Sequence, residues 1–260
     1  MLTNWWKRRR RRKILARPFA AAWDAALREN FVLYGWLSDE ERERLRRRSQ
    51  VFMAEKYWEG CGGLVVSDEM KVTIAAQACL LVLGLEHEYY DRLLSVLVYP
   101  TGYFAEERRH LPAGVISEAT EFRLGEAWTS GPVILSWDDV LAGGRFPRDG
   151  RNVVFHEFAH VLDLDHSGPD GTPELASAEQ YRTWHEVMTA EYNRLRRQSE
   201  RRQRTVLDPY GATDEAEFFA VATEAFFERP QQLLEQHPQL YGLLREFYRQ
   251  EPVRWGGNVE

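Results

Sequence analysis

The chain has 260 residues, of which 44% are hydrophobic and 28% charged, and its formal net charge is −6. This composition is typical of a globular protein and excludes a chain that is disordered throughout. Seven consecutive basic residues form the run Lys7–Lys13, and without them the net charge becomes −13. We expect no sequence-specific nucleic-acid binding, because a body this acidic repels phosphates.

The basic run is the one segment of strongly biased composition. We expect residues 1–13 to be a disordered tail and residues 14–260 to form a single domain with a helical N-terminal part. Contact of the tail with RNA or an anionic membrane stays open as an alternative to a solvated tail. Two cysteines without metal-ligand spacing, and no apolar run of membrane-spanning length, predict a cytoplasmic protein.

Hydrophobic periodicity predicts helices first, then a small sheet, then more helices, which indicates an α+β fold. The predicted helices cover residues 19–34, 39–58, 67–83, 151–164, 177–197, 214–228 and 238–250. Runs rich in β-branched and aromatic residues predict strands at 64–66, 95–99, 114–117 and 133–137. The last of these is a candidate edge strand, which could hold an extended peptide by strand addition.

The run Phe155–Leu162 carries an HExxH motif inside an apolar, helix-compatible stretch. On a helix, His156 and His160 lie on one face, where both imidazoles can ligate one tetrahedral zinc ion. Glu157 lies beside the first histidine and can take a proton from a zinc-activated water without ligating the metal. The motif therefore predicts a zinc hydrolase with Glu157 as general base.

Two histidines do not complete a zinc site, and two residues compete for the third position. His166 follows His160 by six residues, as in metzincins, but Asp163 stands where that pattern has glycine. Glu217, on a separate downstream helix, would give the His₂Glu site of gluzincins with the fourth position open. We favour Glu217, because it needs only side chains that already lie on regular helices.

Further polar residues lie at helical spacing from the ligands. Asp163 and Glu224 are candidates for orienting a ligand histidine through its second ring nitrogen, but both have purely structural alternatives. Tyr210 follows Asp208-Pro209 on a predicted turn, where its hydroxyl could stabilise an oxyanion or its ring could simply pack. The four other histidines, His87, His110, His185 and His237, lack ligand spacing and are expected to be surface or structural residues.

The segments HEFAHVLD (156–163) and YGATDEAEFFA (210–220) together resemble the Mlc titration factor A family of zinc peptidases, the DgsA anti-repressors. They are also similar to the metalloprotease domain of anthrax lethal factor. IAAQACLL (74–81) and GPVILSW (131–137) extend the resemblance over most of the chain. It implies a zincin-like fold of the gluzincin type, with a small mixed sheet packed by helices that include the HExxH helix.

The resemblance also implies roles for individual residues. His156, His160 and Glu217 would be the zinc ligands, Glu157 the general base, and Tyr210 an assisting acid. The expected activity is hydrolysis of a peptide or protein substrate, with endopeptidase or aminopeptidase action left open. The alternative is a regulatory protein that binds and sequesters a transcriptional repressor, with peptidase activity secondary. The resemblance assigns no role to His166 or to the arginine tract.

Overall fold

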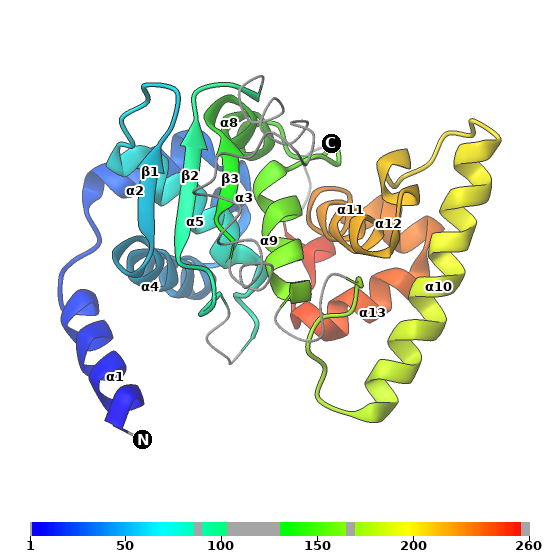
Figure 1. Cartoon of the computed structure of the whole chain (residues 1–260), viewed down its shortest axis with the longest axis horizontal. Helices are drawn as coiled ribbons and strands as arrows, with labels where there is room; N and C mark the ends of the chain where they lie inside the picture. The colour runs from blue at the N-terminus through cyan, green and yellow to red at the C-terminus, as the bar shows by residue number, and fades with distance from the viewer. Residues whose placement is uncertain (1, 86–89, 103–130, 165–169, 256–260) are drawn as a thin grey trace, which may run out of the picture.

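A computed structural model describes residues 2–85, 90–102, 131–164 and 170–255 (Figure 1). The helices are α1 (Leu2–Leu15), α2 (Ala21–Asn30), α3 (Val32–Trp36), α4 (Asp39–Glu55), α5 (Asp68–Leu81), α8 (Trp137–Arg145), α9 (Val153–Leu164), α10 (Ala178–Glu200), α11 (Glu215–Glu228), α12 (Pro230–Gln236) and α13 (Pro238–Tyr248), with short 3-10 turns η1 (Pro209–Ala212) and η2 (Pro252–Arg254). The strands are β1 (Tyr57–Gly60), β2 (Ser95–Tyr99) and β3 (Val133–Ser136). None of the described helices is both long and apolar enough to cross a bilayer.

The described part of the chain is mostly helical with one small sheet, as an α+β fold requires. The strands lie in the order β1-β2-β3, and both pairings are parallel, whereas a mixed sheet was expected. Parallel neighbours need a crossover, and α5 supplies it between β1 and β2. Val96 and Val98 of the central strand are fully buried. Within the described residues β3 ends the sheet, so its role as a peptide-binding edge stays a prediction.

Between residues 19 and 66 the structure differs from the prediction at three places. The single helix expected at 19–34 is two helices, α2 and α3, because the buried Phe31 has a non-helical backbone conformation. The helix expected at 39–58 ends at Glu55, and after Lys56 the residues Tyr57–Gly60 form β1. The strand expected at 64–66 is wrong, since those residues adopt no regular structure and Val65 is exposed.

The remaining predicted helices are confirmed, with ends shifted by a few residues. Ser38 and Glu41 form the predicted capping box of α4, and Ser67 accepts a hydrogen bond from the backbone N–H of Met70 at the start of α5. Helices α8 and α12 were missed, each being only nine residues long or fewer. The strand predicted at 114–117 lies outside the described residues.

The basic segment predicted to be disordered forms helix α1. Two of its cations are paired with acidic groups of the body: Arg11 Nη2 lies 2.6 Å from Glu55 Oε2, and Lys7 Nζ lies 2.6 Å from Asp91 Oδ2. These pairs fix one side of α1, while Arg8 and Arg12 stay exposed. The basic residues of α1 repel one another, and acidic groups on the body of the protein offset this repulsion where the helix docks.

Helix α9 lies between the sheet and the C-terminal helices α10–α13 (Figure 1). Phe155, Phe158 and Leu162 recur at helical spacing and are buried, so they form the apolar face of α9. That face packs against α5 and β3, and α11 lies across the helix. His156, Glu157 and His160 project from the rest of the helix surface and are only partly buried.

Close approach of α8 to α2 depends on Gly144, because a Cβ there would overlap the carbonyl oxygen of Asn30. We predict that Gly144→Ala lowers the free energy of unfolding by roughly 1–3 kcal/mol, since backbone must move to make room. Gly242→Ala is the matched control on α13, where a Cβ would meet nothing within 4 Å. The control should be neutral or stabilising by up to about 1 kcal/mol. Urea denaturation of both variants measures this, and equal effects would contradict the packing account.

Candidate metal centre

The two motif histidines project from α9 toward a common point. His156 Nε2 and His160 Nε2 lie 3.3 Å apart, one helical turn along the same face. The turn before them is held by Asn152, whose side-chain oxygen accepts the backbone N–H of Phe155 at 3.0 Å. The apolar face of α9 is fixed in the core, so the imidazoles are positioned by packing on the opposite side of the helix.

Glu217 completes the cluster from the first turn of α11. Asp214 caps this helix by accepting the backbone N–H of Glu217 at 2.9 Å. The Glu217 carboxylate reaches α9, with Oε2 at 2.9 Å from His156 Nε2 and 3.5 Å from His160 Nε2. Of the two residues considered for the third position, the structure brings Glu217 to the histidines, while His166 lies outside the described residues.

The residues present fit a metal ion. One atom from each of His156, His160 and Glu217 lies within 4.8 Å of the others. Glu217 Oε2 is buried, yet none of its contacts has hydrogen-bond geometry. Two imidazoles and a carboxylate form a donor set that zinc commonly takes. A cation between the three side chains would bind this oxygen directly.

Glu224 holds His156 from the far side of the ring. Glu224 Oε2 lies 3.1 Å from His156 Nδ1, and Glu224 Oε1 accepts the backbone N–H of Asn152 at 2.7 Å. The Nδ1–H therefore donates to a carboxylate, which leaves Nε2 free to face Glu217 and His160. The contact agrees with the sequence-based interpretation of Glu224. The capping of α9 by Asn152 was not predicted from the sequence, although an Asn just before an apolar helical run is an N-cap signal.

Asp163, the other candidate for orienting a ligand, has a different partner. Its two carboxylate oxygens accept the backbone N–H groups of Gly171 and Thr172 at 2.9 and 2.7 Å. It thus ties the end of α9 to the segment that leads into α10. Burial raises the pKa of Asp163 to about 6 despite these bonds.

The charges of the cluster are coupled. Burial disfavours a charged imidazole, but the contacts with Glu217 and Glu224 outweigh it and raise the pKa of His156 to about 10. Burial likewise opposes ionisation of Glu217, yet the two histidines hold its pKa well below the ordinary range. Without a metal, the carboxylate is thus neutralised by a protonated His156. A divalent cation would take the place of that proton.

Tyr210 lies at the edge of the cluster on the turn η1. Its hydroxyl donates to Glu217 Oε1 at 3.3 Å, and its backbone N–H donates to Asp208 Oδ1 at 2.9 Å. Asp208 in turn pairs with Arg151 at 2.8 Å. The side chain of Tyr210 is 55% exposed, so it faces the opening rather than the core. Of the two interpretations of this tyrosine, packing into the core is excluded.

These groups share one cleft of about 970 Å³. It is lined by all five predicted site residues, His156, Glu157, His160, Tyr210 and Glu217. A cleft of this size can admit part of a peptide beside the metal position.

The other histidines that the structure describes lie elsewhere. His185 is exposed on α10, and His237 is buried with its Nδ1 2.7 Å from Glu191. Both match the expectation of surface or structural histidines. His87 and His110 lie outside the described residues.

The model of the glucose-regulated metallo-peptidase M90 family matches residues 4–249. An uncharacterized protein of Synechocystis sp. is 39% identical over 249 residues, covering 95% of this chain and 90% of the relative. Mlc titration factor A of Pectobacterium atrosepticum is 31% identical over 243 residues (91% and 90% covered), and that of Cronobacter sakazakii is 30% identical over 233 residues (89% and 86% covered). The resemblance found in the sequence is confirmed over nearly the whole chain.

We predict that Glu224→Gln weakens zinc binding by about 10- to 100-fold, because the variant loses the charged acceptor that orients His156. Competition with a chromophoric zinc chelator measures the affinity. Glu228→Gln is the matched control, one turn further along α11. Burial raises the pKa of Glu228 to about 8, so the amide resembles the protonated side chain of the native protein. Equal losses in both variants would contradict the orienting role.

We also predict that zinc binding near pH 7.5 releases about one proton, because His156 must lose its proton to ligate. The pKa of His156 is raised above the ordinary 6.5 to about 10, so the proton is held in this pH window. Zinc affinity should accordingly rise with pH up to about 10. Calorimetry in buffers of different ionisation enthalpy counts the protons. Zinc binding without proton release would contradict the coupled His156–Glu217 pair.

Proposed function

The chain belongs to the glucose-regulated metallo-peptidase M90 family, and on this premise we propose that it hydrolyses peptide bonds with a zinc ion held by His156, His160 and Glu217. The observation that carries the proposal is the convergence of these three side chains, from two helices distant in sequence, on one point of the cleft. The family establishes a metallo-peptidase. The choice of zinc rests on the donor set of two imidazoles and a carboxylate.

A bound zinc ion would supply a Lewis acid that polarises the scissile carbonyl and lowers the pKa of a water molecule. Glu157 lines the cleft beside His156 and would accept the proton of the attacking water, then donate it to the leaving amine. The hydroxyl of Tyr210 faces the same opening and would donate a hydrogen bond to the developing oxyanion. Glu224 would keep the His156 ring oriented throughout.

The finer features of the proposal follow from this site. The fold would be zincin-like, of the gluzincin type, with residues 14–260 as one peptidase domain. Aminopeptidase action is a narrower form, supported by acidic side chains in the cleft (Asp139 and Asp149), which would favour a protonated amino terminus. Comparing peptides with free and acetylated amino termini tests it, since an aminopeptidase cleaves only the free form.

Glu157→Gln should lower the rate of peptide hydrolysis by 100-fold or more while zinc stays bound, because the amide cannot accept the proton of water. Hydrolysis of a mixed peptide library, with zinc content measured by mass spectrometry, gives both values. Glu215→Gln, an exposed change on α11, is the control and should leave the rate unchanged. Equal activity of wild type and Glu157→Gln would remove Glu157 from the mechanism.

A regulatory function is the second candidate, favoured by relatives that are named Mlc titration factor A. Under this alternative the chain would bind and sequester a transcriptional repressor in the cytoplasm, with hydrolysis secondary. Purified Glu157→Gln protein used as bait in a cell extract tests it. Selective retention of one transcription factor would support sequestration, and retention of none would leave the peptidase proposal alone.

A further inference from the structure

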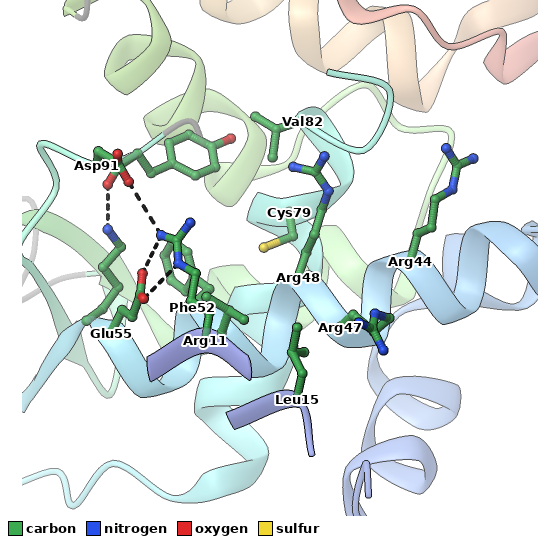
Figure 2. Close-up of a pocket in the computed structure, with 13 residues that line it drawn as sticks. Arg11, Leu15, Arg44, Arg47, Arg48, Phe52, Glu55, Cys79, Val82 and Asp91 are labelled. Carbon is green, nitrogen blue, oxygen red and sulfur yellow. Dashed lines mark hydrogen bonds and ion pairs between the residues drawn. The ribbon is translucent and has the colours of Figure 1, made fainter. Parts of the chain in front are cut away.

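A second cavity, of about 360 Å³, lies between α1, α4 and α5 (Figure 2). It shares no residue with the cleft that holds the metal ligands. Its volume is within the range of sites that take small organic molecules. Any ligand of this cavity would therefore bind apart from the proposed peptidase site.

The lining of this cavity is more apolar than polar. Leu15 of α1, Val51 and Phe52 of α4, and Val82 beyond α5 contribute hydrocarbon and aromatic surface. Cys79 Sγ also faces it (Figure 2), and burial raises the pKa of this thiol to about 12, so the sulfur stays neutral and behaves as an apolar group. The interior thus suits an alkyl or aromatic body rather than a hydrated ion.

The rim carries an excess of positive charge. Arg44, Arg47 and Arg48 extend from α4 along one side of the cavity, as Figure 2 shows. Arg48 Nη2 donates to the carbonyl oxygen of Leu85 at 2.5 Å, but Arg44 and Arg47 have no ion pair or hydrogen bond within the described part of the chain. The acidic groups that line the cavity are already paired with cations. Arg11 binds Glu55 through two hydrogen bonds, and Lys7 pairs with Asp91.

The cavity therefore offers a site for an anionic group next to a site for an apolar group. The guanidinium groups of Arg44 and Arg47 can bind a carboxylate or phosphate through charge-assisted hydrogen bonds. Directly beside them, an apolar surface in an open cavity gains from being removed from water. A neutral apolar ligand would leave the arginines unused, and a simple inorganic anion would leave the apolar surface hydrated.

We propose that this cavity is a binding site for a small amphipathic anion, with its carboxylate or phosphate head on Arg44 and Arg47 and its alkyl body against Leu15, Phe52 and Val82. The inference does not depend on the peptidase proposal. Arg44 and Arg47 are exposed on α4, so the head group lies at the mouth and remains partly solvated. The apolar body reaches the interior, where α1 covers it.

Isothermal calorimetry of the full-length protein with octanoate, octyl phosphate, 1-octanol and inorganic phosphate tests this assignment. Octanoate or octyl phosphate, or both, should bind saturably at one site, and the tighter of the two identifies the head group. We expect 1-octanol and inorganic phosphate to bind at least ten-fold more weakly. Equal affinity for octanol and octanoate, or no saturable binding of either anionic amphiphile, would overturn the proposal.

The double variant Arg44→Gln/Arg47→Gln locates the site. It should weaken binding of the preferred anion at least ten-fold and bring its affinity close to that of 1-octanol. Arg8→Gln/Arg12→Gln removes the same charge from the exposed side of α1 and is the matched control, with unchanged affinity expected. Thermal unfolding checks that both variants fold. Equal weakening in the two would show an effect of net charge alone and overturn the site.

Discussion

The packing of α11 across α9 is the contact on which the proposed metal centre depends. It places the first turn of one helix beside the middle of the other, so Glu217 Oε2 lies 2.9 Å from His156 Nε2. The apolar faces of both helices are buried in the common core, which fixes the distance between ligands through large hydrophobic residues. The polar cluster itself contributes little to folding, because burial of its charges opposes their mutual attraction.

The same contact determines the electrostatics. Glu217 and Glu224 approach His156 from opposite sides of its ring, and both belong to α11. Glu217 faces the proposed position of the metal beside His156 Nε2. Glu224 contacts His156 Nδ1, the ring nitrogen that points away from that position. A single helix thus carries the proposed ligand Glu217 and, two turns further on, the residue that would orient the proposed ligand His156. Any shift of α11 along α9 would disturb both interactions together.

The clustering of His156, His160 and Glu217 was more predictable from sequence than the fold around it. HExxH spacing places two imidazoles on one helical face whatever the tertiary structure, so His156 and His160 follow from local geometry. Glu217 lies about sixty residues further on. To prefer it to His166 as the third ligand, we had to argue that the site keeps its fourth coordination position open. Asn152 and its bond to Glu224 were missed, because a buried hydrogen-bond network depends on how separate elements pack.

The errors in the fold have similar causes. Helical periodicity continues through Phe31, but burial of that ring in the core breaks the helix into α2 and α3. The β propensity of Val65 and Val66 favoured a strand at 64–66, yet hydrogen bonding with β2 selects the less apolar Tyr57–Gly60. The basic N-terminal segment, expected to be a disordered tail, is a helix that pairs with Glu55 and Asp91, and sequence spacing gives no sign of these partners.

We infer that His156, His160 and Glu217 together hold one metal ion. Anomalous diffraction at the zinc absorption edge, from crystals grown with zinc, tests it most directly. The account predicts one strong peak about 2.0–2.2 Å from His156 Nε2, His160 Nε2 and an oxygen of Glu217. A fully occupied peak bound by other residues, with these three side chains left without metal, would contradict it.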